Sequence, residues 1–367
     1  MKEQVAANYE KVKRFLADYS LDGIVLASRA NFSWFTAGKL NYVNAAGELG
    51  VAALLITKDN CICVTNNIEH ARIQQEEMDG TGIEVRSAEW FNAAATKKLW
   101  KELTGSDHLA ADIDVTGLGL QRLPADFMRL RYELSQKAVD QYEELGKLAA
   151  ACLEHTAKNI KKGSSEFEIA AMISHYCLSN GTRPWVILVA ADERIKKYRH
   201  PIMTTARAEK MAEMILCLEQ YGLIVSATRL VSFGPVDSEI AQKHQAVVNI
   251  DTAFIKSTVP GAKMSDVFTK GVNAYAENGY PGEWKLHHQG GPTGYAPRDF
   301  VATFDTDEIV TANQAFAWNP SITGTKSEDT IVATHTGQII VSQAIDWPMI
   351  EGKWQGKKLL RPAILIR

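Results

Sequence analysis

The passage ILCLEQYGLIVSATRLV, residues 215–231, decides the fold of this chain, because its two apolar runs predict a β-hairpin. Three other passages stand around it in a fixed order. TRPWVILVAADERIKKYRHPIMTT comes before it, at 182–205, and contains His200 followed by a proline. HHQGGPTGY at 287–295 and FAWNPSITGTKSEDTIVAT at 316–334 come after it. Candidate site residues concentrate in these four passages.

Length and composition favour a two-domain soluble protein. The chain has 367 residues, 46% of them hydrophobic and 23% charged, with a net charge of -3. This charge gives no reason to expect a nucleic acid or an anionic membrane as partner. The N-terminus lacks the apolar run of a signal peptide. No stretch of about 18 apolar residues occurs in the sequence, so no membrane span is expected. We therefore expect a cytoplasmic protein.

The pattern of apolar residues predicts two domains of different class. Residues 1–130 alternate helices and strands and predict a small α/β domain, in which residues 29–38, RANFSWFTAG, are interpreted as an aromatic-rich loop. A helix from Ser135 to Lys162, with Ser135 as its cap, is expected to open the second domain, 131–367. That domain mixes helices with β-rich segments, which is typical of the α+β class.

The five cysteines are interpreted as reduced thiols. They are scattered and odd in number, which is not the pattern of a disulfide framework. Cys61 and Cys63 form a C-x-C pair in an apolar strand, but no second pair at metal-ligand spacing accompanies them. We interpret this pair as structural.

The four passages together resemble the creatinase/aminopeptidase, or "pita-bread", family, which includes methionine aminopeptidase, aminopeptidase P, prolidase and creatinase. The resemblance covers essentially the whole chain. It implies a creatinase-like N-terminal α/β domain followed by a pita-bread catalytic domain, and a homodimer by analogy with creatinase and prolidase.

Peptidases of this family hold two divalent ions with two aspartates, one histidine and two glutamates, and most of these ligands have no counterpart here. The second aspartate of a D-x-T-R pattern corresponds to Ser226, and no aspartate occurs near residues 215–217, where the first is expected. Gly291 stands at the histidine position and Asn319 at the first glutamate position. Glu328 alone is retained.

A single carboxylate cannot offset four positive charges in a partly buried cavity, since uncompensated buried charge costs several kcal/mol or more. We therefore predict no metal site and no cofactor. Two alternatives stay open: a single ion held by Glu328, His287 or His288 and Cys217, and an atypical Xaa-Pro-type metallopeptidase with a reorganised site.

Creatinase is the member of the family that works without metal, and its histidine acts as the acid and base. His200 falls at the matching place, and an imidazole titrates near working pH. The leading hypothesis is a metal-independent, creatinase-like hydrolase or lyase acting on a C–N bond of a small amide, amidine or dipeptide-like substrate. His200 is the predicted acid/base, with Glu328 and His287 assisting. A non-catalytic small-molecule-binding protein is the alternative from another class.

Substrate contacts are predicted for a wider set of residues: His288, Arg229, Asn319, Trp318, Tyr295, Ser226, Trp185 and Arg298. Each has a simpler structural interpretation. The aromatic residues are either cavity walls or core, and Arg298 binds a substrate carboxylate or holds the domains together. His287 and His288 are expected to face opposite sides of an extended segment. Glu328 could pair with Lys326 or Arg229, and its pairing with Arg229 is the structural alternative to a catalytic role.

Overall fold

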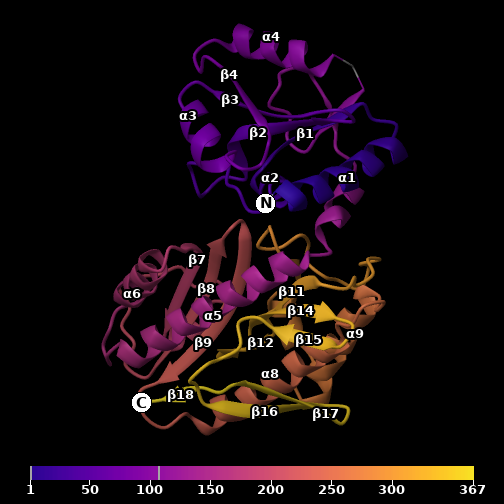
Figure 1. The fold of residues 1–367 in the computed structure, drawn as a ribbon. Coiled ribbons are helices and arrows are strands. Elements are labelled where there is room, and N and C mark those ends of the chain that lie inside the picture. The colour runs from indigo at the N-terminus through magenta and orange to yellow at the C-terminus, as the bar shows by residue number, and fades with distance from the viewer. Residues whose placement is uncertain (1, 106–107) are drawn as a thin grey trace. The chain divides into compact units, whose positions relative to one another are not determined.

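The computed structural model describes residues 2–105 and 108–367 (Figure 1). The chain divides into two compact units, described separately below. The first comprises Met1–Arg131 together with Tyr221–Leu223, and the second comprises Tyr132–Gln220 together with Ile224–Arg367. No helix in the described part of the chain is long and apolar enough to cross a membrane.

The first unit is built on a six-stranded mixed sheet with the order β4-β3-β2-β1-β5-β6. Its centre is fully buried, as the unbroken apolar sequence of β1 requires of a strand covered on both faces. The strands are β1 (Gly23–Ser28), β2 (Leu49–Thr57), β3 (Cys61–Asn66), β4 (Glu84–Ala88), β5 (Leu109–Ala111) and β6 (Gln121–Arg122). The α-helices are α1 (Lys2–Asp18), α2 (Arg29–Phe35), α3 (His70–Arg72) and α4 (Ala93–Thr104), with a π-helix η1 (Ile73–Glu77) and a 3-10 helix η2 (Ala125–Arg131).

Two local predictions in this unit have different outcomes. Residues 29–35 form the helix α2, so the interpretation of 29–38 as a loop was wrong over most of its length. The Ser28 side chain caps this helix by accepting a hydrogen bond from the Asn31 N–H, a start signal that the sequence offered. All five cysteines are free, in agreement with the prediction of reduced thiols.

The second unit contains two four-stranded sheets, with the orders β18-β9-β8-β7 and β10-β11-β14-β15. The first uses β7 (Arg183–Ala191), β8 (Met211–Gln220), β9 (Leu223–Ser232) and β18 (Leu365–Ile366). The second uses β10 (Gly290–Thr293), β11 (Gln314–Trp318), β14 (Asp329–Thr334) and β15 (Gly337–Ile340). Two small hairpins complete it: β12 (Ser321–Ile322) with β13 (Thr325–Lys326), and β16 (Met349–Trp354) with β17 (Lys357–Pro362).

Helices accompany both sheets of this unit (Figure 1). They are α5 (Gln136–Asn159), α6 (Glu166–Ser179), α7 (Glu193–Lys197), α8 (Ser238–Ser257) and α9 (Met264–Glu277), with the short turn η3 (Glu283–Leu286). Ser135 caps α5 as predicted, by accepting from the Ala138 N–H. Ser165 and Glu168 form a reciprocal capping box on α6.

A buried ionic network ties β9, β14, α8 and β17 together. The Arg229 Nη2 lies 3.1 Å from the Asp329 Oδ1, and Arg361 bridges Asp329 and Asp251 at 2.8 and 2.7 Å. All four side chains are buried, so removing one partner would leave an uncompensated charge. This network fixes the strands from which the site residues project.

Candidate functional site

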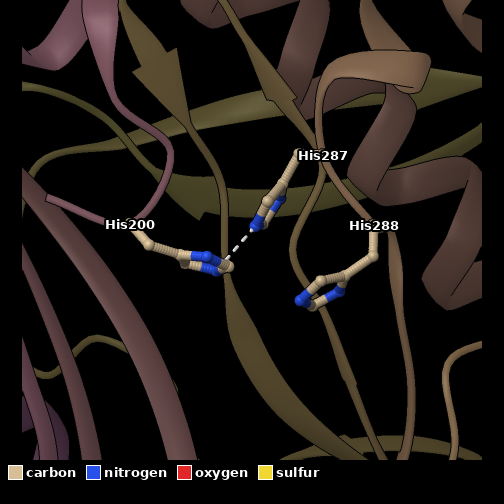
Figure 2. A group of neighbouring side chains, drawn as sticks. All are labelled: His200, His287 and His288. Atoms are coloured by element: carbon tan, nitrogen blue, oxygen red, sulfur yellow. Dashed lines mark hydrogen bonds between the residues drawn. The ribbon is translucent and has the colours of Figure 1, made fainter.

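Three histidines from two segments meet in the second unit (Figure 2). His200 lies between α7 and β8, whereas His287 and His288 lie between η3 and β10. The Nε2 atoms of His200 and His287 are 3.0 Å apart, and the rings of His287 and His288 stack with centroids 4.5 Å apart. The His288 ring is 5.7 Å from that of His200. The fold therefore brings together the three histidines that the sequence passages singled out.

All three histidines are held in the neutral form. Burial and the nearby Lys326 charge lower the pKa of His287 to about 2. Burial and the Arg298 charge lower the pKa of His288 to about 4. The pKa of His200 is lowered mainly by burial and then by Lys326, with Glu328 acting in the opposite direction. At neutral pH the three rings are therefore unprotonated, and the ring nitrogen that carries no hydrogen can accept a hydrogen bond.

Lys326 and Glu328 form a buried ion pair beside these rings. The Lys326 Nζ lies 2.7 Å from the Glu328 Oε2, and the Thr228 hydroxyl donates to the same oxygen at 2.6 Å. Burial alone would raise the pKa of Glu328, but the Lys326 charge and the hydrogen bonds from Lys326 and Thr228 outweigh it and lower the pKa. The retained acid is therefore ionised and already neutralised by a lysine.

A cysteine and a serine stand at the two aspartate positions. The Cys217 Sγ on β8 is 3.3 Å from the Ser226 Oγ on β9, so the two side chains face each other across the hairpin. Cys217 belongs to the range 215–217 in which the first aspartate is expected, and it contacts Ser226. Burial raises the pKa of the Cys217 thiol, and the Glu328 charge adds to the effect. This pair carries no negative charge at neutral pH.

The predicted histidine and first glutamate positions carry no charged or imidazole ligand, since one is a glycine and the other offers only a neutral amide oxygen. A Cβ on Gly291 would lie 2.5 Å from the Phe300 carbonyl oxygen, and the residue has φ +155°. A larger side chain there would clash with backbone. Asn319 keeps a buried Oδ1 with no hydrogen-bond partner among the described residues. Five ligand positions thus offer one carboxylate, occupied by Lys326, and they do not fit two adjacent dications.

Arg298 presents an unsatisfied cationic donor near the same groups. Its Nη1 is buried without a hydrogen-bond partner within residues 2–105 and 108–367. The Arg298 charge acts on Glu328, Cys217 and His288, which places it close to the retained acid and to one histidine. A buried guanidinium N–H without a partner is costly unless a ligand satisfies it. It is suited to binding a carboxylate.

The predicted site residues did not include a further buried acid, Glu213. A cavity of about 10 Å³, roughly one water in size, is lined by Ile195, Tyr198, Arg199, Glu213, His287, Ser321, Thr325 and Lys326. Burial raises the pKa of Glu213 to about 7, against the lowering effect of Lys326 and Arg199. An acid inside the apolar run AEMILCL was the available signal.

Three predicted contacts are corrected by the structure. Trp318 does not line the cavity: it is fully buried, stacks on Phe254 at 4.7 Å, and donates its indole N–H to the Thr258 hydroxyl. Arg229 pairs with Asp329, so its proposed pairing with Glu328 and its substrate-positioning role were wrong.

His287 and His288 do not face opposite sides, because their rings stack. They belong to the link between η3 and β10 rather than to a regular strand, so strict alternation does not apply. Both rings therefore border the same space as His200 (Figure 2).

Two further aromatic residues, Trp185 and Tyr295, were predicted to contact the substrate. Trp185 is half-buried and lies at the irregularity in β7 between Pro184 and Val186. Tyr295 follows β10, and burial raises the pKa of its hydroxyl. Their predicted roles in substrate binding stay predictions.

Comparison with known proteins places this arrangement in a family. Residues 140–335, more than half of the chain, match the metallopeptidase family M24. An uncharacterized peptidase of Staphylococcus saprophyticus is 20% identical over 343 residues, covering 89% of this chain and 97% of that protein. An uncharacterized peptidase of Staphylococcus epidermidis is 20% identical over 349 residues, covering 91% of this chain and 98% of that protein.

Solved structures share the fold at low sequence identity. A Xaa-Pro dipeptidase from Bacillus anthracis superposes with a TM-score of 0.78 at 16% identity, covering 99% of this chain and 100% of that chain. A prolidase from Pyrococcus horikoshii gives 0.79 at 17% identity, over 92% of this chain and 99% of that one. The N-terminal domain of the FACT complex subunit SPT16 from chickpea gives 0.70 at 11% identity, over 94% and 95%.

These comparisons confirm the predicted pita-bread fold, and the family match supports a hydrolase. The chain belongs to metallopeptidase family M24.

Proposed function

We propose that this chain is a hydrolase that cleaves a C–N bond of a small, dipeptide-like amide without the dinuclear metal centre of its family. The observation that supports it best is the buried contact between Lys326 and Glu328, 2.7 Å long. A lysine ammonium here supplies one fixed positive charge where the peptidases bring two dications. The peptidase names of the relatives and the two solved peptidases suggest the substrate class.

The proposed reaction uses His200 as the proton carrier. The neutral His200 Nε2 takes a proton from water as the water oxygen attacks the carbonyl carbon. The same proton then passes to the leaving nitrogen as the C–N bond breaks, which yields an acid and an amine. The Lys326 ammonium stabilises negative charge on the carbonyl oxygen, since a preorganised donor in a poorly solvated site acts strongly.

Arg298 supports a substrate that carries a carboxylate. Its buried, unpartnered Nη1 would donate to a substrate carboxylate, and arginine pairs carboxylates with two parallel hydrogen bonds. A dipeptide or an N-acyl amino acid carries such a group, whereas creatine-type cations find no carboxylate at Thr228 or Asn319.

The experiment is a hydrolysis assay on a dipeptide and N-acyl amino acid panel, including Xaa-Pro dipeptides, with chelator-treated protein. We expect release of the free amino acid without added metal, and a loss of about 10²- to 10⁴-fold in kcat/KM for His200→Ala. His175→Ala, whose side chain is exposed on α6, is the matched control. Undiminished turnover in His200→Ala, or turnover that depends on added Mn²⁺, would contradict the proposal.

A binding protein without turnover is the second candidate, and one observation favours it. The His200 and His287 Nε2 atoms contact each other at 3.0 Å, so the proposed base is already engaged. Native mass spectrometry that finds a bound carboxylic acid, together with no hydrolysis across the panel, would support this candidate over the first.

A further inference from the structure

We propose that His200, His287 and His288, none of which stands at a ligand position of the family's two-metal site, bind one Zn²⁺ ion, and that this ion blocks the base. The binding half of the proposal stands on the geometry alone. The inhibitory half rests on the proposed function, because it assumes that His200 carries the proton.

The three side chains already form a ligand set. One nitrogen from each ring lies within 4.8 Å of the others, and Figure 2 shows the rings converging on one space. With Zn–N bonds of about 2.0–2.1 Å, two nitrogens of a tetrahedral site stand about 3.3 Å apart. The His200 and His287 Nε2 atoms are at 3.0 Å, so this pair needs a shift of a few tenths of an ångström, whereas the ligand nitrogens as a set spread over 4.8 Å and the His288 ring must turn inward to complete the site.

The surroundings allow an ion to enter and to keep a water ligand. His200 is exposed, His288 is partly exposed and His287 is buried, so the cluster opens toward solvent on one side. Three protein nitrogens with one open position is an arrangement that zinc accepts. No hydrogen bond to His288 is formed by any described residue, so its ring is free to turn toward the ion.

The donor chemistry selects the kind of ion. Imidazole nitrogens suit Zn²⁺, Cu²⁺ and Ni²⁺, whereas Mg²⁺, Ca²⁺ and Mn²⁺ prefer oxygen ligands. The adjacent carboxylate of Glu328 is neutralised by Lys326 at 2.7 Å and is not offered to the ion. The site should therefore discriminate against Mn²⁺.

The affinity for zinc should be moderate, below that of a structural zinc site. Metal-binding histidines usually donate their other ring nitrogen to a carboxylate or carbonyl, and losing that partner costs about 10- to 100-fold in affinity. The Nδ1 atoms of His287 and His288 are buried without a partner in the described part of the chain. We therefore expect reversible binding that a chelator removes.

The binding test uses the whole purified protein and metal alone. After incubation with Zn²⁺ and desalting, elemental analysis should find one zinc per chain, and Co²⁺ should give visible d–d absorption bands. His288→Ala and His200→Ala should each lower the affinity at least tenfold, whereas His175→Ala should not change it. Circular dichroism of each variant establishes that it is folded.

Cys217→Ser separates this site from the alternative ion held by Glu328, a histidine and Cys217. Unchanged zinc affinity in Cys217→Ser supports the three-histidine site. Absence of zinc in the wild type, equal affinity in His288→Ala and His200→Ala, or loss of binding in Cys217→Ser would overturn it.

Inhibition is measured separately on any substrate found. Zn²⁺ should abolish turnover in the wild type at the concentration that fills the site, and a chelator should restore it. Turnover that rises with Zn²⁺ would overturn the inhibitory half while leaving the binding result intact. Absence of any substrate would count against the proposed function and not against the zinc site.

Discussion

The Lys326 ammonium lies 2.7 Å from the Glu328 carboxylate, and both side chains are buried. Among the five predicted metal-ligand positions, only the position of Glu328 carries an acid. Because a lysine already neutralises it, bringing in two dications would add four charges to a pocket with no spare carboxylate. Under the proposed function, this contact supplies the charge neutralisation of Glu328 that metal ions would otherwise provide.

Breaking this pair should destabilise the protein. Lys326→Met leaves Glu328 buried and unpaired, which costs about 3–5 kcal/mol in the free energy of unfolding. Urea denaturation at pH 7 measures it. Lys158→Met is the control, because Lys158 also lies 2.7 Å from an acid, Asp346, but at the surface, where a pair is worth at most about 1 kcal/mol.

A double variant tests the reason for that loss. Lys326→Met with Glu328→Gln removes both charges and should recover part of the stability lost by Lys326→Met alone. Equal instability of the double variant would show that packing, rather than the unpaired charge, sets the cost.

Arg298 should govern recognition of a substrate carboxylate. Arg298→Ala removes hydrogen bonds from a charged donor, each worth about 1.5–3 kcal/mol, so KM for a free-acid substrate should rise about 10- to 100-fold. The same substrate with an amidated C-terminus should be hydrolysed poorly by the wild type and little affected by the substitution. A uniform loss of kcat on both substrates would point to a structural role for Arg298.

His244, which borders a small cavity together with Lys326 and Glu328, should make stability depend on pH. Its Nδ1 contacts the Thr325 hydroxyl at 2.7 Å and its Nε2 the Pro362 carbonyl at 3.0 Å. Burial lowers its pKa from 6.5 to about 4. The unfolded chain therefore binds the proton first, and the stability that the neutral ring provides above pH 6.5 is lost as pH falls toward 4.

The substitution His244→Gln isolates this contribution. Its cost in unfolding free energy should be largest above pH 6.5 and should shrink by on the order of 3 kcal/mol toward pH 4. Denaturation curves at several pH values, compared with His175→Gln, measure the difference. A cost that stays constant with pH would refute the assignment.

The fold could be predicted from the sequence because the apolar patterns, the helix cap and the order of the passages all indicate the same architecture. The apolar runs of β8 and β9, the Ser135 cap and the order of the four passages all specify the same architecture. The helix α2 was missed because its aromatic residues suggested a loop, although Ser28 offered a cap.

The candidate site was predicted less well. The alternation of side chains between the two faces of a strand explains the errors. Thr228 reaches Glu328, so Arg229, next to it on β9, must point to the other face, where it meets Asp329. Trp318 precedes Asn319 and likewise turns into the core. Applied to neighbouring positions, this alternation would have excluded both residues from the cavity.

Two features of the site depend on tertiary contacts and could not be predicted from the sequence. The stacking of His287 on His288 depends on the irregular link between η3 and β10. The choice of Lys326 over Arg229 as the partner of Glu328 depends on Asp329 holding Arg229 elsewhere.

Metal content under saturating conditions tests the central claim most directly. The protein is purified from cells grown with Mn²⁺ and Zn²⁺, and elemental analysis is run on the wild type, Glu328→Gln and His288→Ala. We predict at most one zinc per chain, no manganese, the same content in Glu328→Gln and less in His288→Ala. Two ions per chain that disappear in Glu328→Gln would contradict the account.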